Sequence, residues 1–399
     1  METWRRNLYS LWSAQFIAMI GLAMVIPFLP LYLREIGVTE DGAVKIWSGI
    51  LFSSAFLVSA IMQPIWGILG DRHGRKPMIV RALLALALTN FFMGFARTAP
   101  QLLVLRLLQG GLAGFVAPSL ALLASCTPEE MMGQALGTLQ SALVTGMIVG
   151  PFWGGVLAHV MGYRPIFFGT ALFCFIGMLI VCKFVKEDSQ PREKAHHAHL
   201  RDNISFVFRS PTLRAMILLL ILVQVAIQIV TPFLSLYVEY LQVPSEYVGL
   251  MAGVVFGITG ITNALTAPLW GKRGDRIGHL KNLPLSLIGM TASYVPQALV
   301  TDAYQLLGLR ALLGVFVSGV IPTVNTIVQR STTENRRGGI YGIFQSSLLL
   351  GNVIGPLTGG MLAAYLGLRV ILLITASIIA LSYFWFTRRM RSIDLGALR

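Results

Sequence analysis

Long apolar stretches recur along nearly all of this 399-residue chain, and they constrain its fold more than any other feature. A helix needs about 20 mostly apolar residues to cross the hydrocarbon core of a bilayer. The chain is 55% hydrophobic and only 12% charged, whereas a soluble chain is about 25% charged. We therefore predict membrane-spanning helices. The expected spans lie near residues 9–33, 45–69, 77–96, 100–125, 135–158, 163–185, 214–238, 247–270, 283–300, 304–329, 338–363 and 367–387.

The sequence also repeats itself at a spacing of 204 to 205 residues. Pro64-Ile65-Trp66-Gly67 is matched by Pro268-Leu269-Trp270-Gly271, and Gly150-Pro151 is matched by Gly355-Pro356. Duplicated membrane halves are typical of secondary transporters, in which one site between the halves is exposed to each side in turn. We predict an all-α integral membrane protein with twelve transmembrane helices in two pseudo-symmetric six-helix bundles. The bundles are residues 1–185 and 214–399, joined by a polar cytoplasmic linker at 186–213.

The basic charge of the chain indicates membrane topology and not nucleic-acid binding. Most of the 31 Lys and Arg residues fall at the two termini and in the loops on the same side of the predicted spans. Positive residues remain on the cytoplasmic side, so both termini are expected there, in the cytoplasmic (inner) membrane of a bacterium. Contact with membrane lipid, including anionic lipid, is also expected. The exceptions on the opposite side are Arg34, Lys45, Arg97, Arg164 and Arg369.

The chain offers no convincing metal, cofactor or catalytic site. Cys126, Cys174 and Cys182 lack paired spacing, which favours small apolar packing over disulfides or metal binding. The histidines at 196, 197 and 199 lie in the predicted linker without another soft ligand nearby, so a solvated segment is the better interpretation. No nucleophile–base pair or phosphate-binding loop stands out, and we predict that the protein is not an enzyme.

The loop after the second predicted span combines glycines, a carboxylate and cations. Its members are Gly67, Gly70, Gly74, Asp71, Arg72, Arg75 and Lys76. The glycines permit a tight turn, and a carboxylate here could rest against the N-terminus of another helix. We interpret the loop as a conformational latch that holds the cytoplasmic face shut, with Asp275 in the second copy. The alternative is an ordinary positively charged turn.

A charge also lies inside the fourth span. Burying Arg106 in a membrane costs about 2.5 kcal/mol or more, so the side chain is expected to face a cavity or a partner. Its neighbours Gln109 and Gly110 favour the cavity, whereas snorkelling to the membrane surface is the alternative. Its repeat counterpart Arg310 raises the same choice.

The fifth span has a long pattern of small residues. Small residues let helices approach closely, and a proline bends the helix that contains it. We interpret this pattern as a hinge or seam between the two halves, although close packing of ordinary helices is the alternative. The pattern begins at Gly137, and the predicted seam residues are Gly146, Gly150, Pro151, Gly154 and Gly155, with Gly355 and Pro356 in the second copy.

These three motifs together resemble those of the major facilitator superfamily, and specifically its drug:proton antiporter branch with twelve spans. The resemblance covers essentially the full length of the chain. It implies the major facilitator fold, and it implies export of small amphiphilic compounds by proton antiport with alternating access, as in bacterial multidrug efflux. It also implies that Asp71 stabilises the outward-facing state against span 11, that Arg106 assists proton coupling and that Gly150-Pro151 shapes the seam. A monomer is expected.

The acid needed for proton coupling is not obvious, because none of the 17 Asp and Glu residues lies in the middle of a predicted span. Many members of the branch carry an acid in span 1, where this chain has Ala18, Met19 and Gly21. The remaining candidates are Asp71, Glu35 and Glu239, with Arg106 as the counter-charge. The alternative is that these acids are solvated helix ends.

A large apolar cavity with a few amides is the expected substrate site, because amides, Met and aromatic side chains suit varied amphiphilic ligands. The candidate lining residues are Gln15, Met19, Phe28, Gln109, Gln140, Gln224, Gln228, Arg310, Asn325, Gln345 and Asn352. Hydrogen bonding between helices is the alternative role of each amide. A dedicated exporter of an endogenous metabolite, such as a siderophore or sugar, and a membrane protein without transport remain alternative functions.

Overall fold

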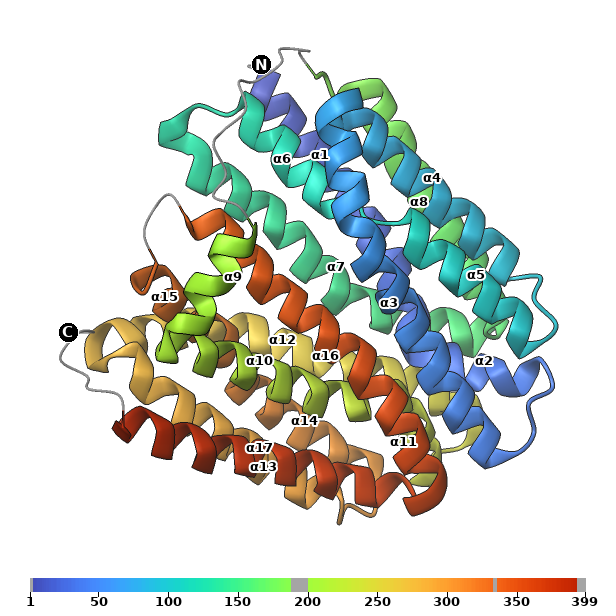
Figure 1. The fold of residues 1–399 in the computed structure, drawn as a ribbon. Helices are drawn as coiled ribbons and strands as arrows, with labels where there is room; N and C mark the ends of the chain where they lie inside the picture. The colour runs from blue at the N-terminus through green and yellow to red at the C-terminus, as the bar shows by residue number, and fades with distance from the viewer. Residues whose placement is uncertain (1–2, 188–199, 333–335, 393–399) are drawn as a thin grey trace. The chain divides into compact units, whose positions relative to one another are not determined.

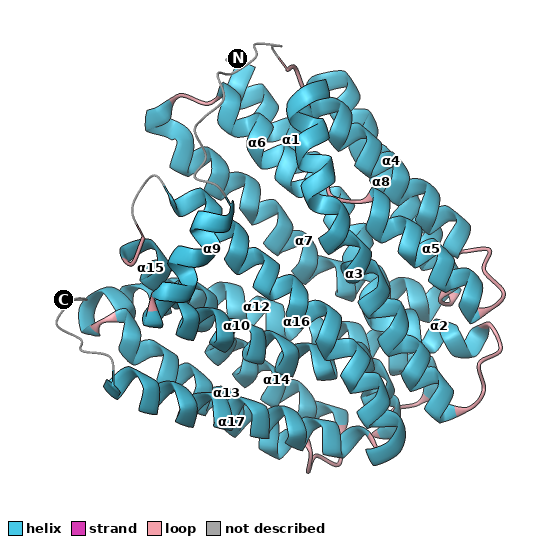
Figure 2. Cartoon of the chain, viewed as in Figure 1, coloured by secondary structure: helices cyan, strands magenta, loops and turns pink. Residues whose placement is uncertain are grey.

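The structure is a computed structural model that describes residues 3–187, 200–332 and 336–392. Within these ranges the chain consists of helices and their connections, without a strand (Figure 2). Eleven described segments are long and apolar enough to cross a membrane. The remaining predicted span, near 283–300, corresponds to the 16-residue helix α13 (Asn282–Gln297), which is shorter than the others. The predicted all-helical membrane fold is therefore confirmed.

Figure 1 shows the course of the chain. The chain divides into two compact units, and the division does not follow the midpoint of the sequence. The first unit contains Met1–Pro191 together with Pro232–Gly257, and the second contains Arg192–Thr231 and Ile258–Arg399. Part of the second sequence copy thus packs as a component of the first unit. This segment includes helix α11 (Leu234–Tyr240) and the first part of α12 (Ser245–Ile277).

The first unit is built around its N-terminal helix. Besides α11 and the first part of α12, its elements are α1 (Thr3–Val25), η1 (Ile26–Phe28), α2 (Leu29–Glu35), α3 (Asp41–His73), α4 (Arg75–Met93), α5 (Ala99–Leu112), α6 (Val116–Cys126), η2 (Glu129–Met131), α7 (Met132–Met161) and α8 (Arg164–Phe184). Helix α1 packs against α7 and α8, α3 against α5, and α4 against α5 and α8. The buried core between these helices is mostly aliphatic, with Leu11, Leu83 and Leu139 among its members.

The second unit repeats this arrangement. Its elements are α9 (Leu200–Arg209), α10 (Pro211–Val230), η3 (Thr231–Phe233, at the border with the first unit), the rest of α12, η4 (His279–Lys281), α13, α14 (Ala303–Val317), α15 (Val320–Arg330), α16 (Arg337–Leu366) and α17 (Leu368–Ser392). Helix α10 packs against α16 and α17 as α1 packs against α7 and α8, and α13 packs against α14 and α17 as α4 packs against α5 and α8.

Prolines set where the long helices bend or break. Pro27 lies in η1, where the first predicted span changes from α1 to α2, and Pro232 does the same in η3. A proline lacks the N–H that the helix needs at this point, so a short 3-10 turn replaces an α-helical turn.

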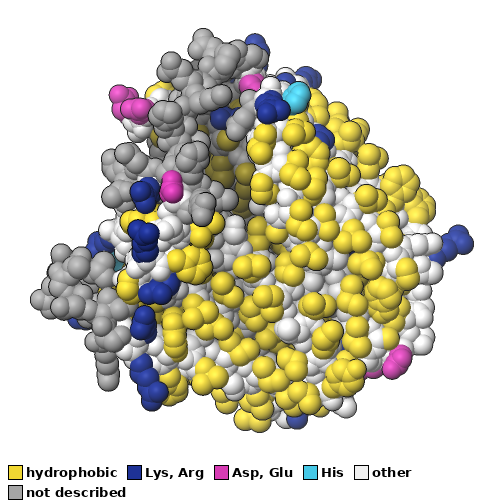
Figure 3. All heavy atoms as spheres, in the orientation of Figure 1, with side chains coloured by type: hydrophobic (Ala, Val, Ile, Leu, Met, Phe, Trp, Pro, Cys, Tyr) yellow, Lys and Arg dark blue, Asp and Glu magenta, His cyan; other side chains and the backbone are white. Residues whose placement is uncertain are grey.

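The face of the molecule in Figure 3 is largely apolar. Several apolar side chains are more than half exposed, among them Ile61, Leu265 and Leu299. A surface of this kind suits contact with lipid chains.

Candidate functional site

A cluster of charged side chains gathers around the short helix α2, and we call Arg34, Glu35, Asp41, Arg164 and Glu239 the α2 charge cluster. Arg34 donates to both carboxylate oxygens of Glu239 on α11 and also to Asp41 Oδ1, at 2.6 Å. Arg164, the first residue of α8, donates to Glu35 Oε1 at 3.1 Å. All five residues belong to the first unit. The cluster therefore links the ends of α2, α3, α8 and α11.

Local sequence places these charges where the helices end. Helix α2 spans only seven residues and ends at Glu35, and Gly37 then turns with φ of 99°. A residue with a side chain rarely adopts this φ, whereas glycine does so readily. Helix α3 begins at Asp41, whose Oδ2 accepts from Lys45 Nζ at 2.7 Å one turn later. The charges thus lie at element ends, outside the apolar interior.

Arg34 and Glu239 occupy equivalent positions of the two sequence copies, because they are 205 residues apart. Each lies on the short helix that follows a repeated Pro-Phe pair, at residues 27–28 and 232–233, and α2 contacts α11. The chain thus places opposite charges at one repeated position and pairs them. Glu35 and Glu239 were predicted from the sequence, but their partners Arg34, Asp41 and Arg164 were not. The opposite charges at an offset of 205 residues were the signal that could have identified Arg34.

The cluster also influences a neighbouring tyrosine in the turn between α7 and α8. Burial raises the pKa of Tyr163 to about 12, and the carboxylates of Glu239 and Glu35 contribute to the rise while Arg34 lowers it. The Tyr163 ring stacks on Phe28, with 6.1 Å between the ring centroids. Tyr163 therefore remains a neutral phenol at neutral pH beside the ion pairs.

Close backbone contacts attach the rest of Pro232–Gly257 to the first unit. A Cβ built on Gly253 of α12 would lie 2.4 Å from the carbonyl oxygen of Pro151, and a Cβ on Gly155 would lie 3.0 Å from Gly249 O. Further along, His159 Nδ1 donates to Glu246 O, and the His159 ring stacks on Tyr247. Two of the predicted seam residues, Pro151 and Gly155, therefore contact α12.

The other predicted seam glycines of α7 meet a different helix, whereas a Cβ on Gly137 would meet nothing within 4 Å. A Cβ on Gly146 would lie 2.7 Å from Met19 Cβ, and one on Gly150 would lie 2.6 Å from Ile20 O. Gly154 similarly meets Met24 O at 2.7 Å. All of these neighbours belong to α1. In the second copy, Gly355 of α16 meets Gln228 and Val225 of α10 in the equivalent way, and Pro356 lies within α16.

The fourth predicted span consists of α5 and α6, with its arginine on α5. Arg106 is half-buried, and its Nη1 donates to Gln109 Oε1 at 3.0 Å, while its Nε is buried without a hydrogen-bond partner. Gly110 packs on α3, since a Cβ there would lie 2.2 Å from Ala55 O. In the second copy Arg310 is 5% exposed, with its guanidinium 5.8 Å from the Tyr294 ring centroid.

The candidate cavity residues differ in their contacts and exposure within their own units. Gln15 is buried and donates to Leu139 O, and Gln224 donates to Asn352 Oδ1 at 2.7 Å, so these amides join helices within a bundle. Phe28 and Gln109 are also buried. The other candidates differ in exposure: Met19 and Gln228 are half-buried, and Gln140, Asn325 and Gln345 are exposed.

The loop at Gly67–Lys76 makes its visible contacts inside the first unit. The Glu187 carboxylate accepts from the backbone N–H groups of Arg75 and Lys76, at 2.7 and 2.8 Å. Lys76 Nζ donates to Cys182 O and Val185 O at the end of α8. This carboxylate at the start of α4 and cation at the end of α8 both complement the helix dipoles. Glu187 was not predicted as part of the site.

The remaining residues of the Gly67–Lys76 loop make fewer contacts. Gly74 turns with φ of 95° between α3 and α4, Gly70 is buried, and Gly67 and Arg72 are exposed. Arg75 Nη1 donates to Ala121 O of α6. Asp71 belongs to α3, but its side chain lies outside the described part of the structure. Asp275 in the second copy is 3.1 Å from His279 Nε2.

No group of three or more His, Cys, Asp or Glu side chains suited to a metal ion occurs among the described residues. The three linker histidines at 196, 197 and 199 lie outside those residues. Cys126, Cys174 and Cys182 are free thiols in the structure.

Comparison with known proteins gives a consistent result. The sequence model described as Major Facilitator Superfamily matches residues 11–263 and 249–394. The chain is 37% identical to "Multidrug resistance protein MdtG" of Salmonella arizonae over 97% of its length and 96% of the relative. It is 37% identical to the protein of the same name from Salmonella typhimurium, over 98% of both chains.

Solved structures with similar folds are more distant in sequence. A bacterial homologue of the human lysosomal transporter Spinster, in an inward-facing and unoccupied conformation, has a TM-score of 0.80 at 15% identity, covering 98% of this chain and 97% of that one. The nucleoside transporter NupG has a TM-score of 0.79 at 14% identity, covering 97% of this chain and 100% of that one. These likenesses support the fold alone, which agrees with the predicted one.

Proposed function

Because the chain belongs to the major facilitator superfamily, we propose that it exports small amphiphilic compounds by proton antiport with alternating access. The name of its relatives, multidrug resistance protein, supports this class of cargo. The observation that carries the coupling proposal is the ion pair between Arg34 and Glu239, because it joins equivalent positions of the two sequence copies. A proton antiporter needs an acid whose protonation changes which conformation is stable.

Glu239 can fill this role through its accessibility and its partners. Its side chain is 39% exposed, so a proton from solution can reach the carboxylate. Protonation would remove the negative charge and leave Arg34 with Asp41 as its remaining anionic partner. The contact between α2 and α11 would then weaken, and this would favour release of the Pro232–Gly257 segment from the first unit. Glu35 with Arg164 is the second pair that a proton would weaken.

The orientation of the chain in the membrane determines which side opens when Glu239 is protonated. Both termini are proposed to be cytoplasmic, in the inner membrane of a bacterium, which places the ends of α2 and α11 on the outer side. Outside acidity would then weaken the outer contacts, open the outer side and allow cargo to leave. Arg106 would help by providing a counter-charge, since its buried Nε has no hydrogen-bond partner in this conformation.

Two further elements of the proposal concern the opposite, cytoplasmic end. We propose Asp71, with Asp275 in the second copy, as the latch that holds this end shut in the outward-facing state. The two bundles at 1–185 and 214–399 would rock as bodies about Pro151 and Pro356, joined by the linker at 186–213. A single chain contains both bundles, so we propose that the monomer is the working unit.

Proteoliposomes with an acidic lumen test the coupling proposal. The acid interior should drive uptake of ethidium by wild-type protein, and Glu239→Gln should abolish the dependence on the gradient while still folding. Glu40→Gln is the matched control, because Glu40 is an exposed acid next to α3 with no role in the cluster. Gradient-driven uptake by Glu239→Gln equal to that of wild type would exclude Glu239 as the coupling acid.

A further experiment separates general drug export from export of one metabolite. Culture medium from a strain lacking the protein is compared with medium from its parent. General efflux predicts similar media and greater sensitivity to several lipophilic cations. A single compound missing from the medium, with unchanged sensitivity, would favour the dedicated exporter.

A further inference from the structure

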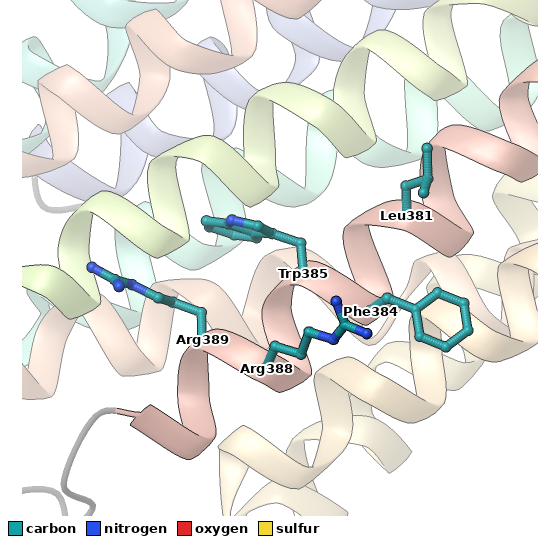
Figure 4. Close-up of a pocket in the computed structure, with 5 residues that line it drawn as sticks. All are labelled: Leu381, Phe384, Trp385, Arg388 and Arg389. Atoms are coloured by element: carbon teal, nitrogen blue, oxygen red, sulfur yellow. The ribbon is translucent and has the colours of Figure 1, made fainter.

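A shallow depression of about 440 Å³ lies at the C-terminal end of α17 and has a lining of mixed character. Leu381, Phe384 and Trp385 form its apolar part, and Arg388 and Arg389 follow on the next turn (Figure 4). Leu381 and Phe384 are 67% and 57% exposed. Figure 4 shows Trp385 and Arg389 projecting from one side of α17 and Phe384 and Arg388 from the other. Apolar surface thus changes to cationic surface within two turns of the helix.

The neighbouring helix α10 brings another cation to the same level. Helices α10 and α17 run antiparallel (Figure 1), and Thr375 Oγ1 donates to Ala226 O at 3.2 Å, which fixes their register. The number of residues from Arg214 to Ala226 is similar to the number from Thr375 to Arg388. At about 1.5 Å per residue, each arginine therefore lies roughly 18–20 Å along its helix from this hydrogen bond. Arg214 and Arg388 therefore lie at nearly the same height.

Helix α9 extends this surface just before α10. Its Val207 is buried, whereas Ile204 and Phe208 are 40% and 64% exposed and lie one turn apart on another face. Arg209 ends the helix and is exposed. An exposed apolar face next to cations is typical of helices that lie in the membrane interface.

Charge on this surface is strongly one-sided. Arg209, Arg214, Arg388 and Arg389 are all exposed. Asp202 is the only acid in the described parts of α9, α10 and α17. Figure 3 shows Lys and Arg side chains in a line along this side of the molecule, bordering hydrophobic surface. A ligand for this surface needs an anionic group and an apolar portion attached to it.

We propose that this surface binds the headgroup of an anionic phospholipid in the cytoplasmic leaflet, and we call it the α17 lipid site. The lipid phosphate would accept hydrogen bonds from Arg388, which projects from the same side of α17 as Phe384, because a guanidinium group matches phosphate geometry. An acyl chain would lie along Leu381 and Phe384. Trp385 is of the type that lies at headgroup level. A zwitterionic headgroup fits less well, because its ammonium group would meet arginines instead of carboxylates.

The first sequence copy lacks this combination and supplies the control. At an offset of 205 residues, Phe384 and Trp385 correspond to Leu179 and Ile180, and Arg388 and Arg389 correspond to Lys183 and Phe184. The end of α8 therefore has no aromatic belt residue before its lysine. Lys183 and Lys186 are both exposed, so neutralising them removes as much charge as neutralising Arg388 and Arg389.

Native mass spectrometry of the purified full-length chain tests the site. The protein is titrated with phosphatidylglycerol or phosphatidylcholine of identical acyl chains, and bound lipid is counted. We expect wild type to retain phosphatidylglycerol preferentially and R388Q/R389Q to bind it about thirtyfold more weakly, since each surface cation contributes a factor of about five. K183Q/K186Q should change binding less than twofold. Thermal unfolding checks that each variant is folded.

Two results would overturn the α17 lipid site. One is an equal loss of phosphatidylglycerol binding in R388Q/R389Q and K183Q/K186Q, which would mean attraction by net charge alone. The other is displacement of bound phosphatidylglycerol by millimolar inorganic phosphate, which would mean that the surface recognises a free anion instead of a lipid. A second variant, Phe384→Ala, should weaken binding of phosphatidylglycerol, and unchanged binding would contradict the proposed acyl-chain contact.

Discussion

The two sequence copies use the same contacts in their interiors and different ones at their helix ends. Trp66 Nε1 donates to Gly111 O at 2.7 Å, and Trp270 Nε1 donates to Val315 O at 2.6 Å. Thr170 Oγ1 donates to Gly21 O, and its counterpart Thr375 donates to Ala226 O. These bonds all reach backbone carbonyl groups. The identity of the accepting residue is therefore free to differ while the geometry remains the same.

The helix ends differ because their contacts depend on side-chain charge. Lys76 ties α4 to the end of α8 in the first copy, whereas Leu280 stands at its equivalent position in the second. Arg34 and Glu239 are equivalent positions with opposite charges. The packing that defines each bundle is thus the same in both copies, whereas the charged contacts at the helix ends differ. Four predictions test this distinction.

The largest effect is expected from adding a methyl group where two helices meet most closely. A Cβ on Gly110 would lie 2.2 Å from Ala55 O, and one on Gly314 would lie 2.4 Å from Thr259 O, at the equivalent place. Gly110→Ala and Gly314→Ala should each lower the free energy of unfolding by about 1–3 kcal/mol, because the backbones must separate. Thermal unfolding in detergent measures this loss.

The same substitution at a second equivalent pair gives the control. A Cβ on Gly67 or on Gly271 would meet nothing within 4 Å. Gly67→Ala and Gly271→Ala should be neutral or more stable by up to about 1 kcal/mol, since alanine favours the helix. If Gly110→Ala and Gly67→Ala unfolded at the same temperature, the close approach of α3 and α5 would be wrong.

The next largest effect should appear in one copy alone. Lys76→Met removes two hydrogen bonds from a charged group to the end of α8 and should cost about 1–3 kcal/mol. Leu280→Met at the equivalent position changes no hydrogen bond and should have a smaller effect. The midpoint of thermal unfolding distinguishes the two variants. Equal shifts would contradict a clamp that is specific to the first copy.

A smaller and symmetrical effect is expected at the repeated tryptophans. Trp66→Phe and Trp270→Phe each remove one N–H donor and leave the carbonyl of Gly111 or Val315 without it. Each variant should lose about 1 kcal/mol of stability. Side-by-side unfolding measurements test the symmetry. A large loss in one variant and none in the other would show that the two interiors are not equivalent.

The smallest effect at neutral pH concerns Tyr163, whose counterpart is Leu368. Its pKa is raised from 10.0 to about 12, chiefly by burial. The folded state therefore holds the phenolic proton more tightly than the unfolded state, so this contribution to stability is complete below pH 10 and is lost as the pH rises through about 12. Tyr163→Phe should match wild type at pH 7 and lose less stability in alkali. An identical alkaline loss in both proteins would contradict this pKa.

The sequence alone determined the class of the molecule. Span length and composition follow from local chemistry, because each helix satisfies its own backbone in a bilayer, and the predicted spans are helices in the structure. The repeat at 204 to 205 residues predicted the duplicated bundles, and the motifs at Gly67–Lys76, Arg106–Gly110 and Gly137–Gly155 indicated the superfamily. It did not predict that Glu187 caps α4, because residue 187 is distant from residue 75 in the chain.

Only the tertiary structure decided which residues meet. Gly146 and Gly150 face α1, whereas Gly155 faces α12, and the small-residue pattern is the same for both. The sequence showed that Glu239 lies at a helix end, but its pairing with Arg34 results from the packing of α11 against α2. Periodicity and length are properties of neighbouring residues, whereas a partner 205 residues away is fixed by how helices pack in space. The sequence therefore specified the helices and their duplication, and the packing specified the contacts between them.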